Sequence, residues 1–376
     1  MMRNDDKPTR AANVNPTSSH ANGEAHAESR ESVMDDRWGY DPETIVSMLY
    51  RLLLGREPDP AGLAHHAERL RADKVTAQEM ARNFVRSTEY RRQAEPQTNG
   101  VINLAGAPSV RVEALGCEFV LPAGSDVVNE LRSPQGYEPW VLPYFLDYCR
   151  PGMTVLDIGA SWGVFSLPAA RRVGPHGRVL AVEVSPWNCR VLTKSIQASQ
   201  LNNVEVLPFG VSDRLGSALL PMQRWTNNNA LDVTRNAEQD DLDRFDLIPV
   251  LPLDAIRAAL SPVHIVKMDI EGMEYRTALG GISFLREQNP LVFSEYSPRF
   301  QQAGSGVDGR ELLLLFFDLG YKIEILHRHA PREQMATADR NEVVKRVDGA
   351  WREHVERDGG THLDLCFHPG GVLSSL

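Results

Sequence analysis

A strand that runs into a glycine-bearing turn constrains the fold of this chain more than any other feature. Apolar residues lead up to Asp157, and the turn after it contains Gly159 and Gly163 before a helix begins near Val164. Gly159 lets a ligand approach the backbone closely, and Gly163 lets the helix pack tightly on the strand. Amides at the start of the helix would face that ligand. The pattern predicts a cofactor loop at the edge of an α/β sheet.

The spacing of the two glycines and a second acidic residue narrow the class of ligand. The loop reads Gly-x-x-x-Gly, whereas a dinucleotide site typically reads Gly-x-Gly-x-x-Gly, so we expect a cofactor without a pyrophosphate. The next predicted strand ends at Glu183, where a carboxylate can accept hydrogen bonds from both hydroxyls of a ribose. Residues 208–213 follow the third strand, and Phe209 in this segment can form an apolar wall for the nucleobase of a ligand. The alternative is that the segment is a plain turn.

Strands and helices alternate along most of the remaining sequence, which favours a mostly parallel sheet covered on both faces. The pattern predicts a helix over residues 137–148, an early irregularity in the loop helix at Pro168, and a helix after Asp308 that ends at Gly320. A charged segment before the last strand resists assignment. The predicted strands cover residues 154–157, 179–183, 204–207, 265–269, 291–295, 321–326 and 362–367.

The chain has 376 residues, enough for more than one domain. Residues 1–40 are polar without an apolar period, so we expect a disordered tail. Residues 41–95 predict a small helical module, with helix starts at Asp41-Pro42 and Asp59-Pro60 and a third helix near residues 76–85. Residues 96–134 predict a linker with short β segments, and residues 135–376 form the α/β domain.

Bulk charge and cysteine usage exclude several classes of protein. The net charge is −10, so nucleic acid is not an expected partner. The four cysteines lie far apart, which indicates reduced thiols and a cytoplasmic protein and argues against a disulfide framework or a zinc site. The longest apolar run is too short to span a bilayer, so we expect no transmembrane segment.

The block from Val266 to Glu274 is the third feature with chemical content. Asp269 falls at the carboxyl end of a predicted central strand, the edge that faces the ligand crevice in open α/β sheets. Lys267 lies two residues earlier on the same face of the strand, so the two side chains can pair. The alternative to a functional site is a structural network of carboxylates at the end of the strand, and this alternative applies most strongly to Glu271 and Glu274.

These pieces together resemble the FkbM-type methyltransferases, which use S-adenosylmethionine (SAM). The likeness spans residues 135–369 and is carried by the loop, Glu183, the Leu253-Asp254 pair, the Tyr137-Glu138-Pro139-Trp140 approach and the Lys-x-Asp-x-Glu-Gly-x-Glu block. It implies a Rossmann-like class I fold with a seven-stranded, mostly parallel sheet whose closing strands are antiparallel. This chain has Ser161 where the family usually has asparagine, and Val184 where it usually has proline.

The resemblance implies a SAM donor and an acceptor oxygen on a sugar, glycan or other secondary metabolite. It also implies the cofactor-binding residues, which are Glu138, Asp157, Gly159, Ala160, Ser161, Gly163, Glu183, Val184, Phe209, Gly210 and Val211. Residues 49–63 with 87–90 resemble a small bacterial helical domain of unassigned function that accompanies surface-glycan proteins. This second likeness implies a bacterial, glycan-related context. If the chain is an interaction protein, residues 41–95 would recruit its protein partner.

Transfer of a methyl group to an alcohol requires removal of the hydroxyl proton. Asp269, Glu295 and Glu271 are the catalytic candidates, and Asp269 with Glu295 would hold a divalent metal such as Mg²⁺ if one is used. His327 or His329 is an alternative base, and Asn227, Asn228 and Asn229 can hydrogen-bond an acceptor or simply form a turn. The competing functions are a nicotinamide oxidoreductase and a non-catalytic scaffold recruited through the helical module.

Overall fold

The computed structural model describes residues 41–54, 57–72, 74–75, 79–80, 83–84, 87, 89, 108–221, 245–335 and 339–370. The expected disordered tail and most of the third helix of the module lie outside these ranges. Helix α1 spans Pro42–Leu54 and α2 spans Pro60–Arg71. Asp59 caps α2 as predicted, since its Oδ1 accepts a hydrogen bond from the amide of Gly62 at 2.8 Å.

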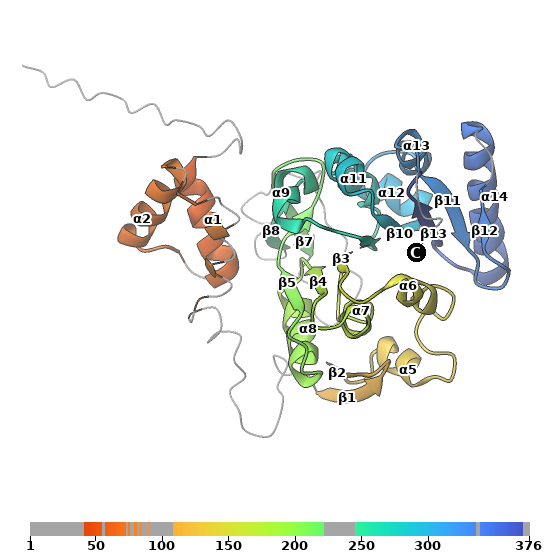
Figure 1. The fold of residues 1–376 in the computed structure, drawn as a ribbon, viewed down its shortest axis with the longest axis horizontal. Helices are drawn as coiled ribbons and strands as arrows, with labels where there is room; N and C mark the ends of the chain where they lie inside the picture. The colour runs from red at the N-terminus through yellow and green to blue at the C-terminus, as the bar shows by residue number, and fades with distance from the viewer. Residues whose placement is uncertain are drawn as a thin grey trace, which may run out of the picture.

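A twisted eight-stranded sheet forms the centre of the α/β domain (Figure 1). Its order is β12-β11-β13-β10-β9-β3-β4-β5. The neighbours β10, β9, β3, β4 and β5 pair in parallel. Strand β13 is antiparallel to both β10 and β11, and β12 is antiparallel to β11. The eighth strand, β12, is a two-residue addition at the edge of the seven expected strands. The bounds are β3 Thr154–Ile158, β4 Arg178–Val182, β5 Val204–Leu207, β9 Ile265–Met268, β10 Leu291–Tyr296, β11 Lys322–Leu326, β12 Glu333–Gln334 and β13 Leu363–His368.

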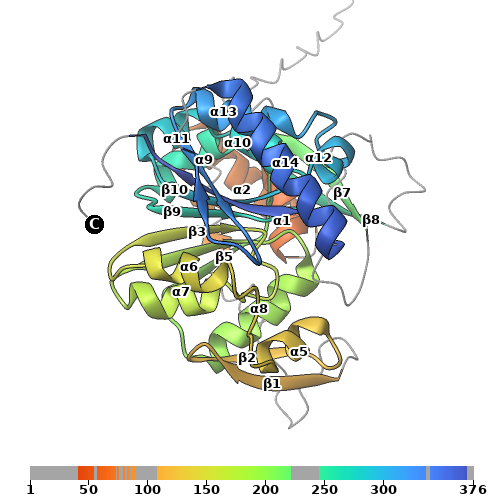
Figure 2. The same cartoon turned by 90° about the vertical axis from the view of Figure 1, so that its right-hand side faces the viewer.

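Helices cover both faces of this sheet, as the alternation predicts (Figure 2). Helices α6 (Leu142–Tyr148), α7 (Ser166–Val173) and α8 (Pro186–Ala198) bury one face. The other face is covered by α9 (Leu253–Leu260), α10 (Glu274–Leu279), α11 (Ile282–Gln288), α13 (Arg310–Asp318) and α14 (Arg340–Asp358). Helix α12 (Pro298–Gly304) packs against the backbone at Gly272. Successive residues of the central strands point alternately into the hydrophobic cores on the two sides of the sheet, so both faces of the sheet are buried.

Two small sheets flank the main one. The hairpin β1 (Ser109–Ala114) and β2 (Cys117–Pro122), followed by α5 (Asp126–Arg132), packs on α8, where Ser195 Oγ accepts from the amide of Val120 at 2.9 Å. Strands β6 (Gly210–Val211), β8 (Phe245–Leu251) and β7 (Gly216–Pro221) form the second small sheet. Among the described residues, none of the helices has both the length and the apolar character that crossing a bilayer requires.

Two predicted elements differ from the structure. The helix expected over residues 137–148 begins only at Leu142, because Glu138 has a φ of +40° and precedes Pro139, a pairing that disfavours helix. The unassigned charged segment contains the 19-residue helix α14. The predicted cap of α13 is displaced by one residue: Gly309 is the N-cap, and the carboxylate of Asp308 before it accepts from the amide of Arg310 at 3.0 Å. Gly320 follows the end of this helix with a φ of +87°.

Candidate functional site

A cleft of about 690 Å³ opens at the carboxyl ends of the parallel strands. It lies where the order of strands reverses, since β4 follows β3 on one side and β9 lies on the other. Ligands bind at this switch point in open α/β sheets. The lining residues are Tyr137, Ile158, Gly159, Ser161, Val182, Glu183, Val184, Asn188, Phe209, Gly210, Val211, Asp269, Ile270, Glu271 and Met273.

The turn after β3 is shaped by its close approach to the end of β9. Gly159 has a φ of +86°, and a Cβ placed there would lie 1.9 Å from the carbonyl oxygen of Asp269. Gly163 has a φ of +88° and would collide with the side chains of Leu167 and Leu192. Glycine is therefore required at both positions, by backbone conformation and by space. Gly159 places the floor of the cleft directly against the β9 terminus.

Glu183 follows β4 and is buried at the bottom of the cleft, where its carboxylate holds the loop. Oε2 accepts from the amide of Ser161 at 2.7 Å, and Oε1 accepts from the amide of Ser185 at 2.8 Å. Burial raises the pKa of Glu183 to about 7, although these amide hydrogen bonds oppose the shift. Asn188 Nδ2 donates a third, longer hydrogen bond to Oε1 at 3.4 Å, so ribose hydroxyls would share or replace part of this set.

Asp157 lies behind the loop rather than in the wall of the cleft. It is 1% exposed, and its Oδ2 accepts from the hydroxyl of Ser166 at 2.5 Å. Its Oδ1 has no hydrogen-bond partner within the described part of the chain. Burial raises the pKa of Asp157, while the ammonium of Lys267 lowers it. Asp157 thus offers a free acceptor atom directly behind the loop.

The structure divides the sequence-predicted residues into three groups. The cleft is lined by Gly159, Ser161, Glu183, Val184, Phe209, Gly210, Val211, Asp269 and Glu271. The side behind the loop holds Asp157, Ala160 and Gly163, and Glu138 and Glu295 line a neighbouring pocket. Sequence reasoning did not assign Tyr137, Asn188 or Met273 to the cleft, and only their proximity to the motifs in the chain could have indicated them.

The neighbouring pocket comprises about 250 Å³, including the solvent space at its mouth, and is rich in carboxylates. Its polar residues are Glu138, Lys267, Asp269, Ser294, Glu295 and Asp364. Burial and the charge of Asp364 raise the pKa of Glu138 to about 8. Burial, Asp269 and Asp364 likewise raise the pKa of Glu295 well above its ordinary value. Asp269 lines both this pocket and the cleft, so the two cavities meet at its side chain.

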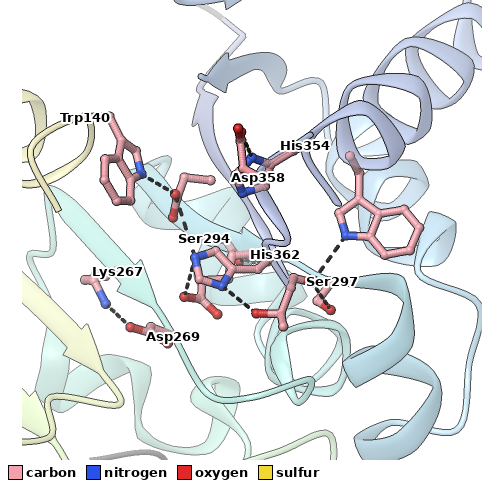
Figure 3. A network of polar contacts seen from close by, with 12 residues as sticks. Trp140, Lys267, Asp269, Ser294, Ser297, His354, Asp358 and His362 are labelled. Carbon is pink, nitrogen blue, oxygen red and sulfur yellow. Dashed lines mark hydrogen bonds and ion pairs between the residues drawn. The ribbon is translucent and has the colours of Figure 1, made fainter. Parts of the chain in front are cut away.

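Lys267 is buried between the two cavities and pairs with Asp269, as its spacing predicts (Figure 3). Its Nζ donates to Asp269 Oδ2 at 2.7 Å and lies 4.2 Å from the centre of the Phe165 ring. Burial lowers the pKa of Lys267, but Asp269 and Asp157 outweigh burial and hold the pKa above its ordinary value. One oxygen of Asp269 is therefore already bound to a permanent cation.

His362 is a site residue that sequence reasoning missed. Its Nε2 lies 3.4 Å from Glu295 Oε1 and 4.0 Å from Asp364 Oδ2 (Figure 3). Asp364 Oδ2 also accepts from the indole of Trp140 at 2.8 Å. The predicted base candidates lie elsewhere, since His327 is 3.7 Å from Glu333 and His329 is 3.8 Å from Asp358. In the sequence, the only sign was that His362 and Asp364 are two residues apart and therefore share one face of a strand. Their position next to Glu295 depends on the pairing of β13 with β10.

The geometry does not favour the predicted metal pair of Asp269 and Glu295, because Lys267 already holds Asp269. Beside the smaller pocket, donor atoms of Glu295, His362 and Asp364 lie within 4.8 Å of one another. Among the described residues a second such group is formed by Glu324, Cys366 and His368. Mg²⁺ prefers oxygen ligands, so a set containing an imidazole suits it poorly.

The remaining sequence predictions concern Asp254 and the three consecutive asparagines before β8. The carboxylate of Asp254, from the Leu253-Asp254 pair, accepts from the amides of Ser283 and Phe284 and caps α11. Asn227, Asn228 and Asn229 lie outside the described residues.

Comparison with known protein families gives two matches. Residues 157–323 match the model of the methyltransferase FkbM domain. Residues 28–94 match a domain of unknown function, DUF4214. Both agree with the resemblances seen in the sequence.

Curated relatives match over shorter stretches. A protein-L-isoaspartate O-methyltransferase from Triticum aestivum is 30% identical over 118 residues, which cover 28% of this chain and 51% of the relative. A ribosomal RNA large subunit methyltransferase E from Nitratidesulfovibrio vulgaris (strain DP4) is 40% identical over 72 residues, which cover 16% of this chain and 35% of the relative. The chain thus spans about half, or less, of the length of these relatives.

Two solved structures match this chain at low sequence identity. The methyltransferase FkbM from Methylobacillus flagellatus KT is 18% identical with a TM-score of 0.35, covering 61% of this chain and 51% of its own. Aeropyrum pernix fibrillarin, titled as a complex with natively bound SAM, is 12% identical with a TM-score of 0.34, covering 69% and 97%.

Proposed function

Residues 157–323 belong to the FkbM methyltransferase family, and from this premise we propose that the protein is a SAM-dependent O-methyltransferase. The acceptor is a hydroxyl of a sugar, a glycan or another secondary metabolite. The observation that carries the proposal is the meeting of two cavities at Asp269, one suited to the donor and one to the acceptor.

The larger cleft has the groups that SAM requires. Glu183 is placed to accept hydrogen bonds from the ribose hydroxyls, and Phe209 with Val184 provides apolar walls for the adenine. Gly159 gives the backbone a close approach, and the free Oδ1 of Asp157 lies behind the loop, where a water could connect it to the amino-acid end. SAM supplies an already activated methyl group, so the protein has mainly to align the acceptor and exclude water.

The smaller pocket supports an uncharged, hydroxyl-bearing acceptor. Its carboxylates at Glu138, Glu295 and Asp364 accept hydrogen bonds from hydroxyl donors. Its ammonium group, Lys267, is already paired with Asp269, so an anionic acceptor would meet uncompensated negative charge. Apolar contacts from Val141, Phe293 and Leu365 complete the pocket and suit the carbon faces of a ring or chain.

Within this pocket, Glu295 is the better general base and Asp269 the better positioning group. One oxygen of Asp269 already accepts a charge-assisted hydrogen bond from Lys267 at 2.7 Å, which fixes the orientation of this carboxylate. Burial and the neighbouring carboxylates raise the pKa of Glu295 well above its ordinary value, which makes this carboxylate the stronger base. Asp269, at the junction of the cavities, then orients the hydroxyl toward the methyl group.

The proposal is tested by ligand binding followed by transfer. Calorimetry of the pure full-length chain with SAM and with NAD is expected to detect SAM binding only. Radiolabelled methyl is then expected to move from SAM to a pool of sugars, glycans or hydroxylated metabolites. Binding of NAD without SAM would overturn the assignment, and SAM binding without transfer to any hydroxylated pool would favour the scaffold function.

We expect Glu183→Gln to weaken SAM binding at least tenfold, because hydrogen bonds to a charged group contribute about 1.5–3 kcal/mol each. The amide would also present a donor to the amides of Ser161 and Ser185, which are donors themselves. The matched control is Glu205→Gln on β5, whose carboxylate lies 3.6 Å from Arg178 and outside the cleft. Equal affinities of the two variants in calorimetry would refute the ribose assignment.

We also expect SAM binding to tighten about tenfold between pH 6 and pH 8, since a ligand that needs ionised Glu183 gains as this group loses its proton. Burial raises the pKa of Glu183 to about 7, and ribose hydroxyls that donate to the carboxylate favour the ionised form. Glu271 and Glu274, whose pKa values burial also raises to about 7, lie nearby. A pH dependence that persists in Glu183→Gln would assign the effect to those groups.

A further inference from the structure

We propose that the carboxylate of Glu271 binds the positive charge of the donor sulfonium, so that the protein holds SAM more tightly than its thioether product, S-adenosylhomocysteine (SAH). This inference rests on the proposed function and adds to it a residue that selects the charged donor. Its basis is the position of Glu271 in the wall of the larger cleft, beside the junction with the smaller pocket.

The place of the sulfonium follows from the two groups on either side of it. In SAM the sulfur is attached to the ribose through a single carbon, and the ribose lies at Glu183 in the proposed binding mode. The methyl group has to face the smaller pocket, which meets the larger cleft at Asp269. Glu271 lies three residues beyond Met268, the last residue of β9, and lines the larger cleft together with Asp269. The sulfonium is therefore confined to the part of the cleft that Asp269 and Glu271 border.

Glu271 has a carboxylate that the protein itself leaves without a partner. Its side chain is half-buried, and it forms no hydrogen bond or ion pair with any other residue of the described ranges. Two neighbouring carboxylates do have partners, since Asp269 accepts from Lys267 at 2.7 Å and Glu274 accepts from the amide of Ile270 at 3.0 Å. Partial removal of a charge from water without a partner costs free energy, so a cation from a ligand is the partner that this geometry lacks.

The charge around the junction favours such a cation. Among the described residues that line the two cavities, Lys267 is the only cation, and its ammonium is already bound to Asp269 (Figure 3). A sulfonium in this region is attracted by the excess of negative charge, whereas an uncharged thioether is not. The acidic residues that line the cavities are Glu138, Glu183, Asp269, Glu271, Glu295 and Asp364.

The backbone holds Glu271 in place. Its φ is +55°, a conformation that is uncommon for a residue with a side chain. Gly272 follows with a φ of +100°, and a Cβ there would lie 2.1 Å from the carbonyl oxygen of Phe300 in α12. The hydroxyl of Ser305 donates to the carbonyl of Gly272 on the same side. The turn is thus fixed against α12, and strained residues of this kind persist where the surrounding structure enforces them, often at functional sites.

Methyl transfer removes the charge that Glu271 binds. The acceptor oxygen forms a bond to the methyl carbon, the bond from that carbon to sulfur breaks, and its electron pair stays on sulfur, which becomes an uncharged thioether. The hydroxyl proton passes to Glu295, the base proposed above. The attraction between Glu271 and the sulfur is then lost, so SAH is expected to leave the cleft readily and to inhibit the next turnover only weakly.

The test compares three ligands that differ at one position. Calorimetry of the full-length chain uses SAM, SAH and sinefungin, which carries an ammonium group where SAM carries its methylated sulfur. The wild type is expected to bind SAM and sinefungin about tenfold more tightly than SAH. Glu271→Gln is expected to weaken binding of SAM and sinefungin about tenfold and to leave that of SAH within about twofold. Measurement at pH 8 keeps Glu183 and Glu271 mostly ionised, since burial raises the pKa of each to about 7.

A matched pair of variants separates charge from folding. Glu271→Asp and Glu271→Asn both place a residue that adopts a left-handed φ readily, and the two differ only in charge. Glu271→Asp is expected to keep part of the preference for the charged ligands, and Glu271→Asn is expected to lose it. Equal preferences in this pair would contradict the proposal, because the effect would then come from the backbone.

The remaining outcomes distinguish this inference from the proposed function. A wild type that binds none of the three ligands overturns the proposed function. A wild type that binds SAM and SAH equally well overturns the role of Glu271 alone. The same holds if Glu271→Gln loses affinity for all three ligands in equal proportion, since that result would assign Glu271 to the α-ammonium group that the three ligands share.

Discussion

Gly159→Ala is expected to destabilise the protein by about 3 kcal/mol or more, since a left-handed φ costs a side chain about 1–2 kcal/mol and overpacking about 1–3 kcal/mol. The φ of Gly159 is +86°, and the new Cβ would lie 1.9 Å from the carbonyl oxygen of Asp269. Because that atom belongs to the backbone at the end of β9, the strand terminus itself would have to move. We therefore expect both the stability in urea and the affinity for SAM to fall.

The matched control for this change is Gly152→Ala. Gly152 has nearly the same conformation, with a φ of +85°, but nothing lies within 4 Å of its Cβ position. Gly152→Ala is expected to lose only the stability that the left-handed backbone conformation costs a side chain, about 1–2 kcal/mol, and to bind SAM normally. If the two variants unfold at the same urea concentration, contact between the loop and the β9 terminus does not determine the shape of the cleft.

The parts of the fold that can be predicted from the sequence are those set by local backbone rules and by periodicity. Gly159 and Gly163 both have the positive φ that their positions in a strand–turn–helix unit suggest. Glu183 follows β4, the parallel neighbour of β3, so two short sequence motifs had to meet at one edge of the sheet. The pairing of Lys267 with Asp269 follows from the two-residue period of a strand.

The parts that cannot be predicted depend on contacts between distant segments. Helix α14 is mostly polar, and its buried residues are Val343, Val347, Asp348 and His354, which form too narrow a stripe for a confident helical pattern. The available signals were its caps, Asp339 and the left-handed Gly359. His362 gains its neighbours only through the antiparallel register of β13 on β10, which no local motif encodes.

Lys267→Met is expected to destabilise the protein by about 3–5 kcal/mol, the usual result of removing one partner from a buried ion pair. Methionine keeps most of the volume, so the loss reports charge rather than packing. Asp157 is 1% exposed and Asp269 would lose its partner at 2.7 Å. Burial raises the pKa of Asp157, and without the ammonium nothing offsets this, so Asp157 binds its proton more tightly when folded than when unfolded. Stability is then retained at low pH and lost as pH rises. The deficit measured in urea should therefore be larger at pH 8 than at pH 5.

Two further variants test whether the loss of stability comes from the burial of the charges around Lys267. Arg257→Met removes an ion pair with Glu287 at 3.1 Å whose side chains are 42% and 53% exposed, and it should cost less than about 1 kcal/mol. Adding Asp157→Asn to Lys267→Met should recover more than about 1 kcal/mol, because it removes a buried charge that has lost its compensation. Additive losses in the double variant would contradict this view and would mean that Lys267 stabilises the domain by packing on Phe165, whose ring centre lies 4.2 Å from Nζ.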